Sequence, residues 1–338
     1  MTKSKKITMS DIAAAAGVSQ PTVSLVLNGS QTVKISEATK RKVLDTAKEL
    51  GYQSKKVAHA LGRSKKIAMV VNGLTSYDPF IDAVNTAREE AWNNDYLLIT
   101  FSYNHDEILA NKIETEINNG DYAGLIYASS MTRELSTQRV QTHLPTVLLN
   151  CTMSDQQNTP SILPADMIGA YKAIKHLTNQ GYRRIAMLAG ESWMYASTQR
   201  IDGYRQALID ADIIPNEDYV LEANWSLKEA YEQTNRLLDL AIPPEAIFCS
   251  SDYMAMGCYQ AIAERQLKIP KDIAIVGYDN QQIASESFPA LSSIELPYAD
   301  MGRLAVDNIL AQIQEQPLLS QIRKVEGELI VRASSTKA

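Results

Sequence analysis

The stretch that decides the fold is Ile7-Thr-Met-Ser-Asp-Ile-Ala-Ala-Ala-Ala-Gly-Val-Ser-Gln-Pro-Thr-Val-Ser-Leu-Val-Leu-Asn-Gly29, near the start of the 338-residue chain. Thr8 and Asp11 have the spacing of a capping box, which predicts a helix that begins there and ends at Gly17. The Ser-Gln-Pro that follows caps and opens a second helix, predicted over 20–28. Two short helices joined by a tight turn are typical of a helix-turn-helix motif.

A third helix completes this N-terminal head. Ser36 has the side chain of a helix cap, apolar residues then recur at helical spacing, and Gly51 marks the end of the helix. The core that the three helices share is predicted to contain Ile12, Val23, Val26, Leu27, Val43 and Leu50.

The second helix of such a motif presents its N-terminal residues to base edges in the major groove. The residues predicted to read the bases are Gln20, Pro21, Thr22, Ser24 and Leu25. Glutamine can pair with adenine, and threonine can bond to a base or touch the thymine methyl group. A plain surface role stays open for each of them.

Charge is distributed very unevenly along the chain. Residues 1–66 hold 13 Lys and Arg against 4 Asp and Glu, whereas residues 67–338 hold 20 against 35. Clustered cations neutralise phosphates, and an acidic body limits non-specific binding to nucleic acid. The pattern favours a DNA-binding head on an acidic body, with a solvated lysine-rich tail as the alternative.

The head resembles the lactose/galactose-repressor (LacI/GalR) family over 7–29, and the likeness continues through 35–43 and 49–52. The resemblance implies that five residues hold DNA phosphates: Ser19, Asn28, Thr39, Lys40 and Tyr52. Leu25 departs from the family, which usually has arginine there, so we expect a different operator sequence.

The segment Lys55-Lys-Val-Ala-His-Ala-Leu-Gly-Arg63 resembles the hinge helix of that family. The resemblance implies that Leu61 enters the minor groove, where an apolar wedge unstacks a base step and bends the duplex. Packing of Leu61 on the body is the alternative.

The body is predicted to contain two doubly wound α/β units, because short apolar strands alternate with amphipathic helices. The predicted strands are 67–71, 96–100, 124–127, 146–149, 184–188, 246–249, 273–276 and 327–332. The first four are continuous apolar runs, typical of strands buried on both faces. The predicted helices are 79–94, 106–119, 132–142, 167–180, 200–211, 253–266 and 299–315.

The body resembles the periplasmic sugar-binding proteins (type I) through the same family, notably at 181–190, 199–208, 251–257 and 275–280. The resemblance places an effector between the lobes. The residues implied to bind it are Arg200, Trp225, Ser251, Asp279 and Tyr298, with Tyr77 and Phe80 as a wall from the first lobe. The guanidinium of Arg200 and the carboxylate of Asp279 could clamp vicinal hydroxyls, and Trp225 and Tyr298 offer flat apolar faces. Strand-end capping by Asp279 and core packing of Trp225 stay open.

Other classes of protein are disfavoured by what the sequence lacks. It has no dinucleotide-binding fingerprint, P-loop, nucleophile elbow or HExxH motif, so no enzyme and no cofactor are expected. Its three cysteines lack paired spacing, which disfavours a disulfide framework or a metal site. We expect no membrane span and no secretion signal, and hence a cytoplasmic, nucleoid-associated protein.

The predicted organisation is a head over 1–54, a hinge helix and linker over 55–66, and an effector-binding body over 67–338. The first lobe is expected over 67–163 and 297–324, and the second over 164–296 and 325–338. The predicted function is that of a repressor that binds a pseudo-palindromic operator as a homodimer, controlled by a sugar-like small molecule. The alternatives are a nucleoside or purine effector, and a constitutive DNA-binding protein whose body only dimerises.

Overall fold

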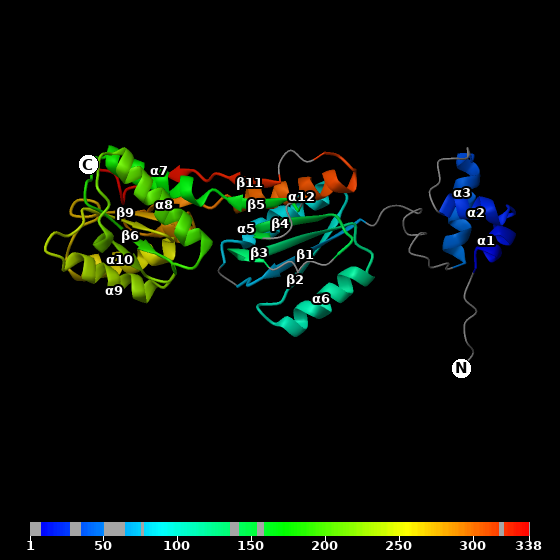
Figure 1. Cartoon of the computed structure of the whole chain (residues 1–338), viewed down its shortest axis with the longest axis horizontal. Coiled ribbons are helices and arrows are strands. Elements are labelled where there is room, and N and C mark those ends of the chain that lie inside the picture. The colour runs from blue at the N-terminus through cyan, green and yellow to red at the C-terminus, as the bar shows by residue number, and fades with distance from the viewer. Residues whose placement is uncertain are drawn as a thin grey trace.

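The computed structural model describes residues 8–27, 35–50, 65–75, 78–135, 142–153, 159–317 and 321–337. Figure 1 shows three groups of elements along the long axis, a helical head at the N-terminal end and two α/β lobes. The head contains α1 (Met9–Ala16), α2 (Gln20–Leu27) and α3 (Glu37–Glu49).

Local sequence features set the ends of the head helices. Thr8 caps α1 in a complete capping box with Asp11, and Gly17 ends the helix in the left-handed region at φ 62°. The apolar faces of the three helices meet in one small cluster that contains Ile12, Ala13, Ala16, Val23, Val26, Leu27, Val43 and Ala47, with Leu50 packed against it. The predicted head is therefore confirmed in its helices and in its core.

The first lobe is a parallel six-stranded sheet with the order β11-β5-β4-β3-β1-β2. Its strands are β1 (Lys66–Asn72), β2 (Leu97–Ser102), β3 (Gly124–Leu135), β4 (Thr146–Met153), β5 (Ser161–Pro164) and β11 (Ile322–Val325). Helices α5 (Ile81–Asn93) and α12 (Tyr298–Ile313) bury one face, and α6 (Glu107–Asn119) packs on the other.

The second lobe has the order β12-β10-β9-β8-β6-β7, parallel except for β12, which pairs antiparallel with β10. Its strands are β6 (Ile185–Ala189), β7 (Val220–Glu222), β8 (Ala246–Cys249), β9 (Ala274–Asp279), β10 (Ser292–Glu295) and β12 (Leu329–Ile330). Helices α7 (Asp166–Asn179) and α8 (Tyr195–Asp210) cover one face. Helices α9 (Leu227–Leu238), α10 (Asp252–Glu264) and α11 (Gln282–Glu286) cover the other.

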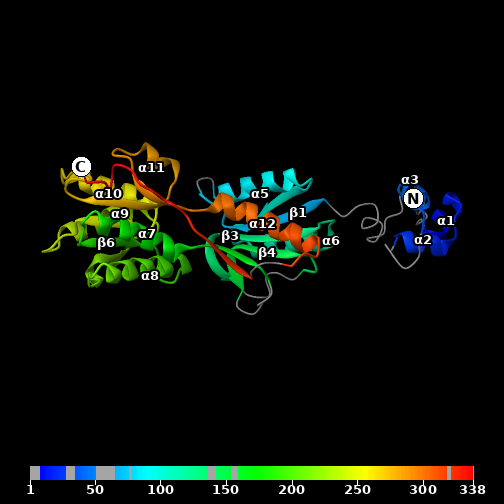
Figure 2. The same cartoon turned by 90° about the horizontal axis from the view of Figure 1, so that it is seen from above.

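The chain passes between the two sheets three times, from β5 to α7, from β10 to α12 and from β11 to β12. Figure 2 shows these segments running between the lobes. Two doubly wound α/β units, as predicted, are thus linked by three connections rather than by one flexible linker. Ligands of such sheets bind beyond the carboxyl ends of the strands, which directs attention to the residues at those ends.

Two predictions about the first lobe are wrong. Residues 132–135 do not begin a helix, because β3 continues through them and pairs again with β4 after a bulge between Ala128 and Arg133. The predicted strand 96–100 is not buried on both faces, because β2 forms the edge of the sheet and Leu97 is exposed. Elements that the sequence analysis did not predict are β5, β7, α9, β10, α11 and β11.

Within the described ranges, none of the helices combines the length and the apolar character that crossing a lipid bilayer requires. All three cysteines are buried and have free thiols.

Candidate DNA-binding surface and effector site

The first turn of α2 lies at the surface of the head. Ser19 caps it, since its Oγ accepts a hydrogen bond from the backbone N–H of Thr22 at 3.3 Å and lies 2.8 Å from the Thr22 hydroxyl. Gln20 and Pro21 are exposed, while Val23 on the inner face is fully buried. The cap fixes the start of the helix and the core fixes its inner face, so Gln20 and Pro21 remain accessible to an outside partner.

The other described residues of the predicted DNA-binding set are half-buried. Ser24 and Leu25 follow on α2, and Thr39 and Lys40 lie in the first turn of α3. Ser36 caps that turn, accepting a hydrogen bond from the Thr39 N–H at 3.1 Å. Predicted residues that lie outside the described ranges are Asn28, Tyr52 and Leu61, with hinge positions 55–64.

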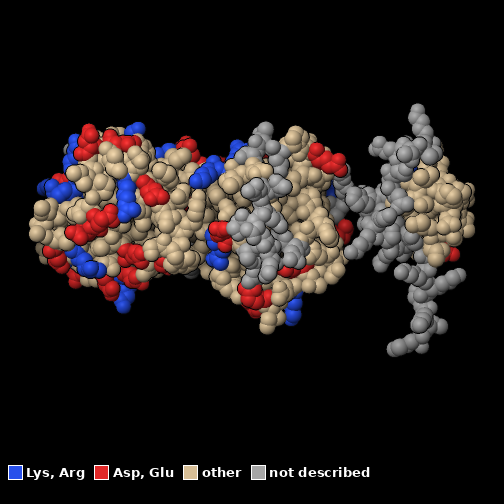
Figure 3. Space-filling model, in the orientation of Figure 1, with Lys and Arg blue, Asp and Glu red and all other residues tan. Residues whose placement is uncertain are grey.

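Charged side chains of both signs are mixed on the visible surface of the body. Figure 3 shows blue and red atoms interspersed over the visible face of both lobes. Several form exposed ion pairs, such as Lys172 with Glu326 at 2.8 Å and Arg205 with Glu217 at 2.7 Å. The visible face of the body therefore lacks the continuous basic surface that a phosphate backbone requires.

A buried ion pair lies at the centre of the candidate effector site. Arg200 on α8 contacts the Oδ1 of Asp166, at the start of α7, through Nε at 2.9 Å and Nη2 at 2.8 Å. Its Nη1 donates to the Ser250 carbonyl, and its guanidinium stacks 3.6 Å from the centre of the Tyr278 ring. Burial raises the pKa of Asp166, and the charge of Arg200 opposes that effect. Asp166 and Ser250 therefore already engage three nitrogens of the guanidinium that was predicted to clamp hydroxyls together with Asp279.

The residues just after β7 and at the end of β9 have unusual backbone conformations. Asn224 and Trp225 have φ values of 50° and 57°, and Asp279 and Asn280 have 109° and 53°. Bulky side chains rarely adopt positive φ, and such strain concentrates where a site requires it. Two of the predicted effector residues, Trp225 and Asp279, thus lie in strained turns at the carboxyl edge of the second sheet.

Trp225 packs within its own lobe. Its Nε1–H points at the Met194 sulfur at 2.9 Å, and a Cβ on Gly190 would lie 2.2 Å from two atoms of its ring. Arg200 lies 5.5 Å from the ring centre. The absence of a side chain at Gly190 is therefore what lets the indole lie beside the buried ion pair.

Two carboxyl groups meet at the start of α10. Ser251 caps this helix, accepting from the Met254 N–H at 3.1 Å. The next residue, Asp252, accepts from the Ser293 hydroxyl at 2.6 Å and the Gln281 N–H at 2.8 Å. Burial raises the pKa of Asp252 to about 7, and burial together with the charge of Asp252 raises the pKa of Asp279 well above its usual value. Burial and the neighbouring carboxyl group therefore both disfavour the charged form of Asp279.

The first lobe contributes aromatic and amide groups. Tyr298 and Phe80 pack edge to face, with ring centres 5.1 Å apart, in the core of that lobe. The Tyr298 hydroxyl accepts from Asn150 Nδ2 at 3.4 Å, and Asn150 also donates to the carbonyls of Ser129 and Ser130. Burial raises the pKa of Tyr298 well above its usual value, so the hydroxyl stays neutral. Phe80 is fully buried, and Tyr77, its predicted companion, lies outside the described residues.

Three residues that organise this region were not predicted from the sequence: Asp166, Asp252 and Asn150. Asp252 stands beside the predicted Ser251 and starts a helix, so an acidic residue there could have been noticed. Asn150 lies inside β4 with φ 57°, a left-handed conformation that asparagine adopts more readily than most residues. Asp166 had no local signal, because its partner lies 34 residues further along the chain.

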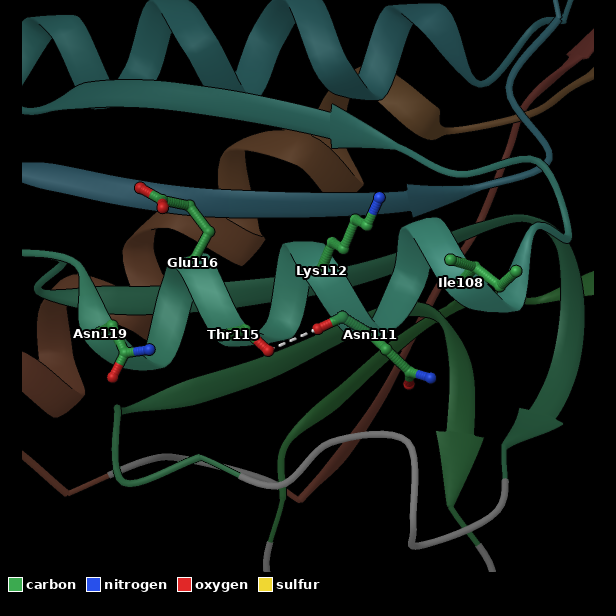
Figure 4. Close-up of a pocket in the computed structure, with 6 residues that line it drawn as sticks. All are labelled: Ile108, Asn111, Lys112, Thr115, Glu116 and Asn119. Carbon is green, nitrogen blue, oxygen red and sulfur yellow. Dashed lines mark hydrogen bonds between the residues drawn. The ribbon is translucent and has the colours of Figure 1, made fainter.

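A hollow of about 440 Å³ lies elsewhere, along one side of α6. Figure 4 shows Ile108, Lys112 and Glu116 projecting from this helix, with the Thr115 hydroxyl donating to the Asn111 carbonyl at 2.8 Å. None of the predicted effector residues lines it, so it is separate from the candidate effector site.

Comparison with known proteins identifies the family. The family model of bacterial regulatory proteins, lacI family, matches residues 8–55, and that of the periplasmic binding protein-like domain matches 174–335. The HTH-type transcriptional repressor PurR of Mannheimia succiniciproducens is 30% identical over 98% of this chain and 99% of its own length. The chain belongs to the LacI family. The ribose operon repressor of Haemophilus influenzae is 32% identical over 91% of the chain and 92% of its own length.

Solved structures agree with this assignment. The transcriptional regulator CelR in complex with cellobiose is 26% identical, with 97% of this chain and 99% of that one covered and a TM-score of 0.70. The lac repressor dimer bound to operator and an anti-inducer is 27% identical, with 98% and 100% covered and a TM-score of 0.69. This LacI-family chain is thus a transcriptional repressor with a DNA-binding and a ligand-binding domain, and its relatives are repressors rather than enzymes.

Proposed function

We propose that this repressor binds a pseudo-palindromic operator as a homodimer in the cytoplasm, at the nucleoid, and that a small molecule held between its lobes sets the affinity. Residues 1–54 form the head in this proposal, 55–66 the hinge, and 67–338 the body. The observation that carries this proposal is the exposed first turn of α2, which Ser19 caps. The same chain has a body with a buried ion pair between Arg200 and Asp166.

The DNA-binding part of the proposal is supported by the order of the head. A reading helix must be held rigidly so that its first residues can reach base edges, and the Ser19 cap and the buried Val23 hold α2 in this way. Two heads related by a twofold axis match two operator half-sites, and the similar lac repressor was solved as a dimer bound to operator.

The effector part of the proposal names a sugar or sugar derivative. Asp166, Arg200 and Asp279 provide the charged and polar groups that recognise hydroxyls, beside the flat ring of Trp225. The similar CelR was solved with cellobiose, and one relative is named a ribose operon repressor. A nucleoside is the second candidate, since the indole face of Trp225 suits a base as well as a sugar.

In the proposed control, effector binding and operator binding are thermodynamically linked. An effector shifts operator affinity only as far as it binds the two arrangements of the lobes with different affinity. The expected coupling is on the order of 1–3 kcal/mol, or roughly 5-fold to 150-fold in operator affinity.

Selection of duplexes from a random library by the purified full-length protein tests the DNA-binding proposal. We expect one enriched pseudo-palindrome, and Gln20→Ala should change the preferred base at one position in each half-site. Gln206→Ala, which removes an exposed glutamine from α8 in the body, is the matched control and should leave the preference unchanged. Absence of any enriched sequence would contradict operator binding. An enriched operator whose affinity no sugar or nucleoside alters would instead favour the constitutive alternative.

A further inference from the structure

Five buried polar atoms without a hydrogen-bond partner gather at the carboxyl edge of the second sheet. They are Asp166 Oδ2, Glu191 Oε2, Ser197 Oγ, Asn224 Oδ1 and Ser250 Oγ. Glu191, Asn224 and Ser250 follow the ends of β6, β7 and β8, while Asp166 and Ser197 lie in the first turns of α7 and α8. Native proteins leave few such atoms unpartnered, so a cluster of them at one edge of a sheet indicates a place where a ligand supplies the missing bonds.

All five atoms can accept hydrogen bonds, and only the two serine hydroxyls can also donate when the carboxyl groups are ionised. The carboxylate oxygens of Asp166 and Glu191 can accept hydrogen bonds when ionised but cannot donate, and the Asn224 carbonyl oxygen can only accept. The serine hydroxyls can do either. The Asn224 amide group already donates to Glu229 at 2.8 Å, which fixes its oxygen as the unpartnered atom. The complementary ligand must therefore present several O–H or N–H donors.

The charges nearby are already balanced. Arg200 is paired with Asp166, and three of its nitrogens are engaged by Asp166 and Ser250, so its charge is not available for a second anion. Arg332, which lies near Asp252, donates to Asn280 Oδ1 at 2.7 Å and to the Leu291 carbonyl at 2.7 Å. Lys324 is exposed and donates to Gln199 Oε1 at 3.4 Å, and its charge acts on Asp166 only as a minor influence that lowers the pKa of that carboxyl group. A phosphate dianion, which accepts hydrogen bonds and donates none, would face acceptors and carboxyl groups.

We propose that the effector is an uncharged molecule with at least three O–H or N–H donors on neighbouring atoms, a free polyol or a nucleoside, and that its phosphate monoester is rejected. This inference rests on the proposed function, because it concerns the same site. Polar sites reject ligands that leave their buried groups unpaired far more strongly than apolar pockets reject a misfit. We expect a phosphate ester to bind at least about 100-fold more weakly than the parent compound.

Calorimetry on the full-length protein with matched pairs of ligands tests the proposal. The probes are common aldoses, disaccharides and nucleosides, each beside its phosphate monoester at constant ionic strength, with inorganic phosphate as a competitor. Binding of a neutral member with loss of affinity in its ester supports the inference. An ester that binds as tightly as its parent overturns the inference but leaves the proposed function intact. Failure of every probe to bind or to alter operator affinity counts against both.

A serine variant separates ligand recognition from folding. Ser250→Ala removes a hydroxyl that has no partner in the folded chain, so the free energy of unfolding without ligand should be unchanged or slightly higher. The affinity for the neutral ligand should fall roughly fivefold to twentyfold. Ser285→Ala, an exposed serine on α11, is the control and should leave the affinity unchanged. Equal ligand affinity in the wild type and Ser250→Ala, with a ligand known to bind, would remove Ser250 from the recognition surface and contradict the argument from unpartnered atoms.

Discussion

Asp166→Asn should strongly destabilise the second lobe. The side chains of Asp166 and Arg200 are 0% and 5% exposed, and the substitution leaves the buried guanidinium with the Ser250 carbonyl and the Tyr278 ring but no negative charge. Removal of one partner from a buried ion pair costs about 3–5 kcal/mol. Arg205 and Glu217 form an exposed ion pair that serves as the control. Their side chains are 41% and 70% exposed and lie 2.7 Å apart, and Arg205 is on α8, the helix that carries Arg200. Glu217→Gln should therefore cost about 0–1 kcal/mol.

The assay is urea denaturation of the full-length variants at one protomer concentration, because dimerisation would make the unfolding midpoint depend on concentration. Circular dichroism follows the whole chain, and tryptophan fluorescence includes Trp225 in the affected lobe. If Asp166→Asn and Glu217→Gln lower the free energy of unfolding by the same amount within error, the reasoning is refuted. A double variant, Asp166→Leu with Arg200→Met, should recover most of the loss, because no uncompensated charge remains buried.

Three further predictions follow from local geometry. Gly190→Ala would place a methyl group 2.2 Å from the Trp225 ring, so the indole must move, and both its fluorescence and effector affinity should change. Asp252 has a folded-state pKa of about 7, so its stabilising contribution is present at low pH and is lost between about pH 4 and pH 7. Wild type should therefore lose stability relative to Asp252→Asn as the pH rises through that window, and parallel pH profiles would contradict this. Thr8→Ala removes the capping box with Asp11 and should destabilise the head by about 0.5–2 kcal/mol, measured by thermal melting against Ala14→Ser on the exposed face of α1.

The head was predictable because its determinants are local. Thr8, Asp11 and Gly17 lie within ten residues, and each defines a helix end through its own backbone or side-chain geometry. The alternation of apolar strands and amphipathic helices likewise predicted two doubly wound units. The sequence pattern did not predict the short strand β5, because its four residues carry no periodicity and one of its two partners, β11, lies near the end of the chain.

The geometry of the candidate effector site could not be read from the sequence. Family resemblance pointed to Arg200 as an effector-binding residue, which stays a prediction, and its partner Asp166 comes from another helix that only the folded chain brings near. The wrong prediction that a helix begins at residue 132 has a similar cause. Thr132, Arg133 and Glu134 have no strong strand propensity, and tertiary pairing with β4 keeps them extended.

The position of the buried ion pair relates ligand binding to the arrangement of the two lobes. Asp166 directly follows the connection from β5, and Tyr298 directly follows the connection from β10, so two candidate ligand contacts begin where the chain passes between lobes. At the third connection, Lys172 of the second lobe donates to Glu326 at 2.8 Å. A rotation of one lobe against the other must bend these three connections, and it therefore changes the distances between contacts on opposite sides of the site. A ligand that contacts both sides then favours one arrangement by its difference in affinity, whereas a ligand bound to one lobe alone shifts nothing.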